Sequence, residues 1–193
     1  VATVKTVLIL HGESTFDFVE ALAAAHPKAR IIRIHLTSDI TRTVAADHWQ
    51  CALDDPAGLQ TCLADVADID RVFFLALDAP EQQQLAQQLK KSAPLELQLT
   101  RLANLLKRKM ASRASLDLFV LSLDSWRLDD GVCNAHGAGL TGLAYSIAQS
   151  EHRFKLRNMD LSWCDLQTAA DRTALAQRLI VQSASDRGVL SKF

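Results

Sequence analysis

Residues 71–77 read RVFFLAL and residues 116–123 read LDLFVLSL, and these two apolar runs decide the fold. Continuous runs of this kind, without polar alternation, are typical of strands that are buried on both faces. Between them a helix is expected over 79–110, interrupted near Pro94, with leucines at positions i, i+4, i+7 and i+11 counted from Leu95. Two strands joined through a helix of this length form a parallel βαβ unit.

The same alternation of strand and helix patterns extends over the whole chain. Further strands are predicted at 4–11, 29–36, 155–161 and, as a short one, 49–53. Further helices are predicted at 16–25, after the Asp55-Pro56 pair, at 138–150, and at 166–183 with Asp165 as its cap. The polar stretch 37–46 predicts no element. We therefore expect one α/β domain over 1–193, a Rossmann-like, doubly wound and mostly parallel sheet of about six or seven strands.

Composition limits the kinds of partner. The 193 residues are 49% hydrophobic and 22% charged, and 21 Lys and Arg nearly balance 22 Asp and Glu. The net charge of −1 predicts a globular domain without the basic surface that nucleic acid or an anionic membrane requires. No run approaches the roughly 20 apolar residues of a membrane helix, and the N-terminus lacks a signal-peptide pattern, so we expect a cytoplasmic protein. Because the chain begins at Val1 rather than Met, we expect a fragment of a longer protein.

The four cysteines predict no metal site. Cys51, Cys62, Cys133 and Cys164 form no CxxC pair, and none stands beside a histidine at zinc-ligand spacing. In a cytoplasmic protein we expect them to be reduced thiols, buried or partly buried.

The first strand–helix turn does not predict a dinucleotide site. Such a turn needs glycines, because the pyrophosphate approaches the backbone closely at the start of the helix. The turn from His11 to Phe18 reads HGESTFDF and keeps only Gly12, while Phe16 and Phe18 occupy positions where the glycine pattern would close. The chain has 7 glycines and no GxGxxG motif. We therefore predict no cofactor-binding residue in this segment.

Other catalytic patterns are also incomplete. A short-chain reductase needs a Tyr and a Lys four residues later, but the only tyrosine, Tyr145, is followed there by Gln149. No GxSxG motif is present. His11 ends the first strand, where open α/β sheets place ligands. Asp124 and His136 follow a central strand and form either a polar cleft or a solvated loop.

Three segments carry a resemblance to a known family. They are DDPAGLQTCLADVADIDRVFFLALD (54–78), LDLFVLSLDS (116–125) and AHGAGLTGLAYSIAQSEHRFKLRNMDLS (135–162). Each resembles a segment of the ketoreductase domains of modular type I polyketide synthases. They occur in the order and spacing of the N-terminal half of such a domain and together extend over most of the chain.

The resemblance implies a non-catalytic, structural subdomain. In these ketoreductases the N-terminal half is a truncated pseudo-Rossmann subdomain that binds no cofactor, and the C-terminal half carries NADPH and the catalytic residues. Matching GLTGLAYSIAQ (139–149) to the helix that follows the active-site Tyr and Lys of an active short-chain reductase places Cys133 at the tyrosine position and Gly137 at the lysine position. The resemblance thus implies no catalytic, cofactor-binding or metal-binding residue here. Glu151, one place later than expected, and His152-Arg153, where proline is common, leave the synthase subtype open.

The partners and the alternatives follow from the same comparison. The implied partners are the catalytic ketoreductase half, neighbouring synthase domains and an acyl carrier protein, with no nucleic acid and no membrane. The parent synthase would be an enzyme, whereas this segment would not be one. Two alternatives stay open: a free-standing or spacer pseudo-ketoreductase that acts as an interaction module, and a small-molecule-binding Rossmann-like enzyme that uses His11, Asp124 and His136.

Overall fold

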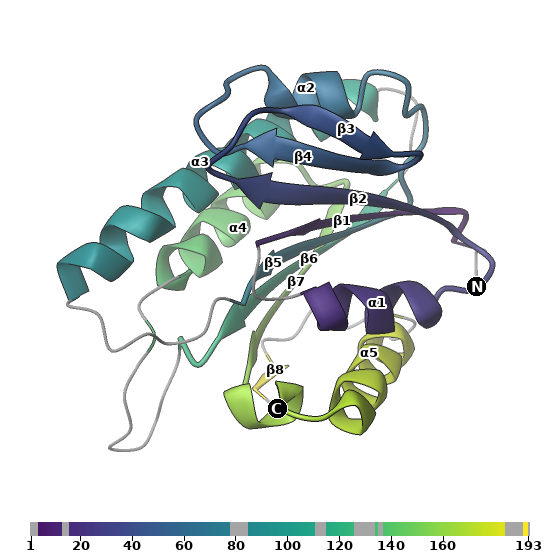
Figure 1. The fold of residues 1–193 in the computed structure, drawn as a ribbon, viewed down its shortest axis with the longest axis vertical. Helices are drawn as coiled ribbons and strands as arrows, with labels where there is room; N and C mark the ends of the chain where they lie inside the picture. The colour runs from purple at the N-terminus through teal and green to yellow at the C-terminus, as the bar shows by residue number, and fades with distance from the viewer. Residues whose placement is uncertain are drawn as a thin grey trace.

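One eight-stranded sheet runs through the centre of the molecule, in the order β3-β4-β2-β1-β5-β6-β7-β8 (Figure 1). The computed structural model describes residues 4–12, 16–77, 85–110, 115–125, 134, 137–183 and 191–192. The strands are β1 (Thr6–His11), β2 (Arg30–Thr37), β3 (Arg42–Ala45), β4 (His48–Ala52), β5 (Arg71–Ala76), β6 (Leu116–Leu123), β7 (Phe154–Leu161) and β8 (Ser191–Lys192). Every pairing except that of β3 with β4 is parallel, which confirms the Rossmann-like doubly wound fold.

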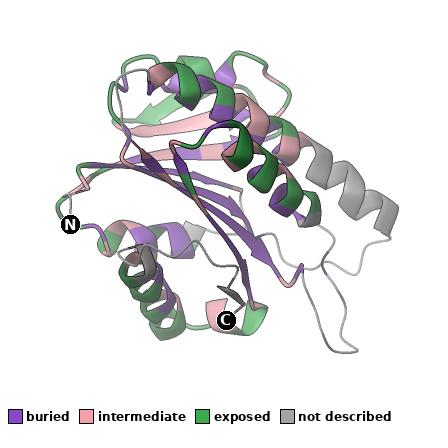
Figure 2. Ribbon diagram, turned by 180° about the vertical axis from the view of Figure 1, so that it is seen from behind, coloured by how far each residue is buried: buried purple, intermediate pink, exposed green. Residues whose placement is uncertain are grey.

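Helices cover both faces of the sheet (Figure 1). One face carries α1 (Phe16–Ala24) and α5 (Ala169–Ser183), and the other carries α2 (Gly58–Cys62), α3 (Leu85–Lys109) and α4 (Ala138–Ser150). Each helix layer encloses its own apolar core, and the central strands are buried along nearly their whole length (Figure 2). Burial on both faces explains why these strands read as continuous apolar runs.

The edge of the sheet contains a hairpin that the sequence did not predict. The stretch 37–46 contains β3, which pairs antiparallel with β4. With β3 and the two-residue β8, the sheet has eight strands rather than the expected six or seven. All four residues of β3 are exposed, so the strand lacks the apolar positions by which a strand is recognised. Asp47 makes the turn at φ 59° and its carboxylate accepts a hydrogen bond from Arg30 Nε at 3.0 Å.

Helix α3 is continuous, whereas the sequence predicted an interruption at Pro94. The proline lies inside the 25-residue helix and removes one backbone hydrogen bond, which typically costs about 3 kcal/mol. The leucine face offsets this cost, because each buried leucine contributes about 1.5–3 kcal/mol. The four leucines of that face are 0–5% exposed: Leu95, Leu99, Leu102 and Leu106.

Two helix starts differ from the predicted ones. The last helix begins at Ala169 rather than Leu166, after a 3₁₀ turn at Trp163–Leu166. Its cap is Thr168 rather than Asp165, because Thr168 Oγ1 accepts the Asp171 N–H at 3.1 Å while donating to the Asp171 carboxylate at 2.6 Å. The helix α2 begins at Gly58 with Ala57 at the N-cap, so Pro56 precedes the helix, and Asp55 accepts the Ala57 N–H at 2.9 Å in the turn before it.

A buried ionic cluster ties three strands together on the α1 and α5 face. The Asp117 carboxylate accepts hydrogen bonds from Arg71 at 3.1 Å and from Arg157 at 3.3 Å. Both guanidinium groups lie over the Phe119 ring, at 5.6 and 5.3 Å from its centroid. Arg71 also contacts His26 at 3.0 Å, and burial lowers the pKa of that histidine so that its ring stays neutral.

The cysteines of the described part of the chain are all free thiols. Cys51 and Cys62 are buried, as expected, but Cys164 is exposed, because it lies in the 3₁₀ turn outside both cores. Cys133 lies outside the described residues. Among the described helices none is long and apolar enough to cross a membrane.

Candidate functional site

The order of the strands reverses between β1 and β5, and doubly wound proteins bind their ligands at this point of the sheet's carboxyl edge. His11 ends β1, and Leu77 follows β5 as a buried residue. Gly137 lies against the end of β5 at φ 85°, where an added Cβ would be 3.2 Å from Ala76 Cβ. A lysine at this position, which an active reductase would need, meets both an unfavourable φ and this close contact.

His11 stacks on the imidazole ring of His35 of β2. The two residues are register partners, and their rings stack 5.1 Å apart with an angle of 6° between their planes. His11 Nδ1 donates to the Gly12 carbonyl oxygen at 2.7 Å, so Nε2 is the unprotonated nitrogen. Burial lowers the pKa of His11 to about 4, with the nearby His35, His48 and Arg33 acting in the same direction. His11 is therefore uncharged at neutral pH and cannot serve there as a cationic acid.

Both imidazoles present a buried nitrogen that no group of the described residues satisfies. The Nε2 atoms of His11 and His35 are buried without a hydrogen-bond partner. His11 itself is only 3% exposed. A buried acceptor without a donor is uncommon, so this pair is the strongest ligand-directed feature of the carboxyl edge.

Asp124 is held by the backbone of the neighbouring strand end. Its carboxylate accepts the Trp163 N–H at 3.1 Å, and its own N–H donates to the Leu161 carbonyl at 2.9 Å. It adopts φ 47°. His11 ends β1 and Asp124 follows β6, with β5 between these strands, and the register places Asp124 three residues further along the strand direction than His11. Within the described ranges no hydrogen bond joins the two, and His136 lies outside them, so the grouping of these three residues stays a prediction.

A second polar group at this edge was missed by sequence reasoning. Asp160, at the end of β7, accepts the Ser122 hydroxyl at 2.7 Å and the Ser125 N–H at 2.9 Å. Asp160 and Ser122 are register partners on β7 and β6. The available signal was an acidic residue closing a mostly buried strand, but its partner became identifiable only with the register. These bonds join the two strand ends.

The start of α1 does not fit a dinucleotide phosphate. Asp17 lies in the first turn of the helix, where its carboxylate would repel a pyrophosphate, and it forms an ion pair with Arg172 at 3.4 Å. Phe18 is buried in the apolar core and lines a small cavity of about 230 Å³ with Leu77 and Trp163. Residues 13–15 and the side chain of Phe16 lie outside the described part of the chain. Among the described residues, the start of α1 thus offers a carboxylate and a core phenylalanine rather than groups suited to an anion.

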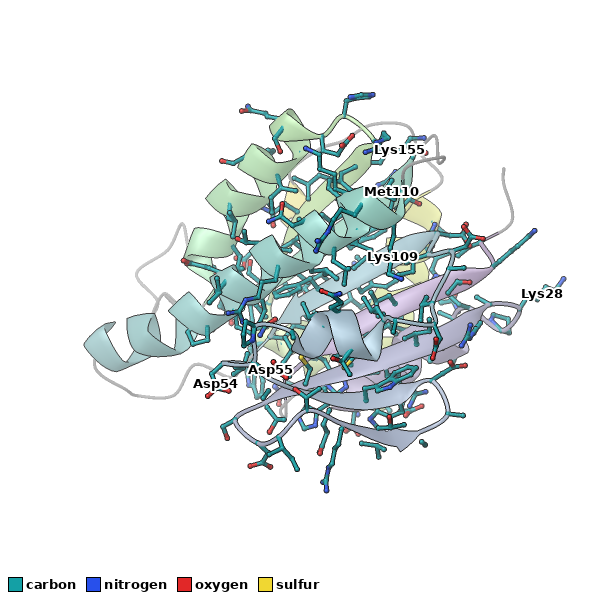
Figure 3. All side chains as sticks on the ribbon, turned by 90° about the horizontal axis from the view of Figure 1, so that it is seen from above. Lys28, Asp54, Asp55, Lys109, Met110 and Lys155 are labelled. Atoms are coloured by element: carbon teal, nitrogen blue, oxygen red, sulfur yellow. The ribbon has the colours of Figure 1, made fainter. Side chains whose placement is uncertain are left out.

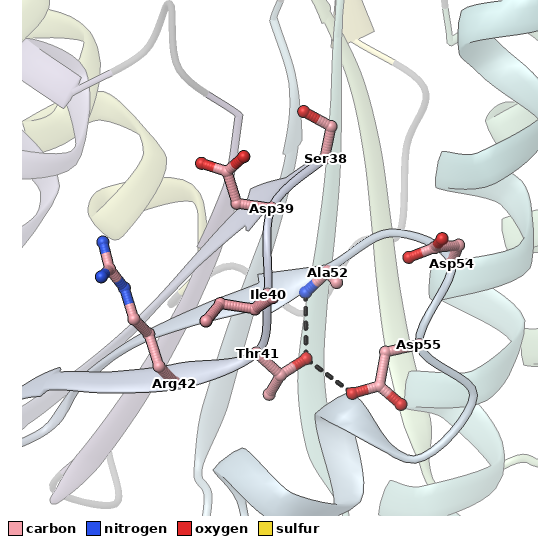
Figure 4. A pocket seen from close by; sticks show the side chains of 8 residues that line it. All are labelled: Ser38, Asp39, Ile40, Thr41, Arg42, Ala52, Asp54 and Asp55. Atoms are coloured by element: carbon pink, nitrogen blue, oxygen red, sulfur yellow. Dashed lines mark hydrogen bonds between the residues drawn. The ribbon is translucent and has the colours of Figure 1, made fainter.

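A larger hollow of about 650 Å³ lies at the ends of β2 and β4 (Figure 4). Asp39, Asp54 and Asp55 line it together with Arg42. The Thr41 hydroxyl donates to Asp55 at 2.6 Å and, with the Ala57 N–H, lowers the pKa of that carboxyl group. A 2′-phosphate of NADP needs a cationic partner near the end of the second strand, whereas three carboxylates dominate here.

Helix α4 carries the chain's tyrosine without the lysine that a short-chain reductase needs four residues later. Tyr145 is 39% exposed on the outer side of the helix, and Gln149 follows one turn later, also exposed. Gln149 is a neutral amide, so it cannot provide the cation that a catalytic phenol at Tyr145 would need. Within the described ranges, no group of three His, Cys, Asp or Glu residues is placed to hold a metal ion.

Solved structures of other proteins share this fold, although their sequences differ widely from this one. No family model and no curated protein matches the chain. Solved structures do. A keto acid-selecting NRPS module with adenylation, ketoreductase and pseudo-Asub domains gives a TM-score of 0.80 at 10% identity over 100% of this chain, which spans 16% of that one. A short-chain dehydrogenase from Streptomyces avermitilis gives 0.67 at 15% identity, over 100% of this chain and 88% of that one.

An enzyme with a bound dinucleotide shares the same fold. Gluconate 5-dehydrogenase from Burkholderia cenocepacia, in complex with NADP and tartrate, gives a TM-score of 0.62 at 9% identity, over 97% of this chain and 93% of that one. The chain therefore has a Rossmann-like α/β fold, which it shares with these short-chain dehydrogenases. At these identities the likeness concerns the fold, and the chemistry has to be argued from the residues.

Proposed function

We propose that this chain is a non-catalytic structural subdomain that supports the NADPH-dependent β-ketoacyl reductase half of a polyketide synthase. The observation that carries the proposal is that the described residues at the matched lysine position and at the start of α1 are unsuited to catalysis and to phosphate binding. Gly137 stands at the lysine position, and Asp17 and Phe18 stand where a phosphate would bind. The TM-score of 0.80 to a module that contains a ketoreductase, over the whole chain, supports the same reading.

The physical role would be that of a rigid support. The sheet has an apolar core on each face, and side-chain hydrogen bonds join strand ends at its carboxyl edge. Such a domain would hold its shape without a ligand. The partners in this proposal are the catalytic ketoreductase half, neighbouring synthase domains and the acyl carrier protein of the parent. NADPH would bind in the catalytic half alone, and residues 1–193 would form one domain of the larger synthase.

Binding and turnover measurements on two proteins test the proposal. Calorimetric titration of NADPH into the purified 193-residue chain is expected to show no binding, and the chain is expected not to reduce a β-ketoacyl thioester. The natural polypeptide that contains the chain is expected to do both, and to lose thermal stability when residues 1–193 are deleted. NADPH-dependent reduction by the 193 residues alone would show the proposal to be wrong, as would a natural polypeptide without reductase activity.

The buried acceptor of His11 favours a second candidate, a small-molecule-binding domain. Its Nε2 atom is buried without a donor among the described residues, beside the equivalent atom of His35. A ligand with a hydroxyl or amide donor would satisfy it. Screening of such ligands by thermal shift, with His11→Phe as the comparison, tests this candidate: a ligand that stabilises both proteins equally does not use His11.

A further inference from the structure

A narrow groove of about 200 Å³ lies between α2 and α3. Its polar side chains are Arg101, Asn104 and Arg108 of α3 and Gln60 of α2. The spacing of α3 places its three residues on one face of the helix. All four side chains offer N–H donors, and no carboxylate lines the groove. The two arginines thus give the lining of the groove a positive charge, although the chain as a whole has a net charge of −1.

The two guanidinium groups have few protein partners. Arg101 donates only long hydrogen bonds, at 3.4 and 3.3 Å, to the carbonyl oxygens of Leu53 and Asp55. Arg108 is exposed, and within the described ranges it forms no hydrogen bond or ion pair. Its neighbour Lys109 differs, since it donates to the Val66 carbonyl at 3.0 Å and so joins α3 to the loop after α2. The charge of Arg108 has no such structural use.

The floor of the groove is apolar. Pro56, Leu59 and Leu105 lie between the cationic and amide groups, and the two leucines are 3% and 7% exposed. Arginine side chains around an apolar centre are typical of protein–protein contacts. Nucleic acid is a poor occupant, because Asp54 and Asp55 adjoin the same helix pair and interrupt any basic path for a phosphate backbone (Figure 3).

We propose that the α2–α3 groove is a docking site for an acidic segment of a partner protein. Carboxylates of that segment pair with Arg101 and Arg108, and an apolar side chain lies against the floor formed by Leu59 and Leu105. The charge complementarity of a lining with two guanidinium groups and no carboxylate selects an anionic partner over a neutral or basic one. This inference goes beyond the support role and does not depend on the chain belonging to a reductase.

Fluorescence anisotropy with two synthetic peptides tests the site. One is a fluorescein-labelled peptide of repeated Glu-Leu-Ala-Glu units, and the other carries Lys in place of each Glu. We expect binding of the acidic peptide alone, weakened roughly tenfold between about 50 and about 500 mM salt, because exposed charges are screened. NMR spectra of the same mixture are expected to show shifts of the Arg101 and Arg108 Nε–H signals.

Variants that reverse or remove one positive charge test whether the acidic peptide binds in the groove. Arg108→Glu and Arg101→Gln are expected to weaken binding of the acidic peptide about tenfold and about threefold. Lys28→Glu makes the same charge change as Arg108→Glu at an exposed position far from the groove (Figure 3) and is expected to change it less than twofold. Equal effects of Lys28→Glu and Arg108→Glu would overturn the proposal. Displacement of the peptide by millimolar inorganic phosphate would also overturn it, since the groove would then be a small-anion site.

Discussion

Lowering the pH from 7 to 5 is expected to destabilise this protein through His11. The ring is buried beside His35, and its neighbours His48 and Arg33 add unfavourable positive potential. In the folded state its pKa lies at about 4, whereas in the unfolded chain it returns to 6.5. Below pH 6.5 the unfolded state therefore binds the proton first. The stability contributed by the neutral ring is complete above pH 6.5 and is lost as the pH falls through 4.

The two pKa values set the magnitude. The free energy of unfolding falls by about 3 kcal/mol in all between the two pKa values, since each pKa unit corresponds to about 1.4 kcal/mol. Between pH 7 and 5 the same linkage gives a loss of about 2 kcal/mol from His11. For a domain of this size, that loss lowers the midpoint of thermal unfolding by about 4–8 °C.

Urea unfolding of three proteins at pH 7 and pH 5 measures this contribution. His11→Phe keeps a ring for stacking on His35 but removes the titrating group and the bond to the Gly12 carbonyl, so it is less stable at pH 7 by about 1 kcal/mol. Its further loss between pH 7 and 5 is expected to be about 2 kcal/mol smaller than in the parent protein. His152→Gln, at a side chain that is 95% exposed, serves as the matched control and is expected to follow the parent. The same pH dependence in His11→Phe and in the parent would refute the argument.

Three further substitutions test the buried charges and the glycines. Asp117→Asn leaves Arg71 and Arg157 without their shared carboxylate and is expected to lower the free energy of unfolding by about 3–5 kcal/mol in urea titrations. Gly137→Ala, at φ 85°, is expected to lower it by about 1–2 kcal/mol. Gly142→Ala adds a Cβ in the middle of α4 with nothing within 4 Å, and is expected to raise the free energy of unfolding by about 0.5–1 kcal/mol. A stabilising Gly137→Ala would contradict the left-handed helix start, and a destabilising Gly142→Ala would contradict the open outer face of α4.

The sequence predicted the elements that bury apolar side chains in a regular pattern, and it missed the exposed strand β3. The strand at 116–123 and the helix at 138–150 have the predicted bounds, because continuous apolar runs and a helical repeat report burial directly. The strand β3 escaped prediction because its four residues are exposed and carry no such pattern. The break predicted at Pro94 was wrong because the packing of α3 outweighs a local preference.

The candidate site was predictable in position but not in composition. His11 was expected at the carboxyl end of a strand, and it lies there. Its stacking on His35 depends on the register between β1 and β2, and the bond between Asp160 and Ser122 depends on that between β6 and β7. A sequence reads along one strand at a time, so pairs that form across strands become visible only when the register is known.

Several polar groups near the carboxyl edge of the sheet are engaged in bonds within the protein. In a dinucleotide-binding domain, polar groups at the strand ends are kept for the ligand. Here they are engaged within the protein: Asp160 binds Ser122 and Ser125, and Asp17 pairs with Arg172. Each such pair satisfies a polar group at the strand ends that a ligand would otherwise satisfy. These bonds agree with the proposal that this segment binds no NADPH, whereas the unsatisfied Nε2 atoms of His11 and His35 at the same edge are the feature on which the second candidate function depends.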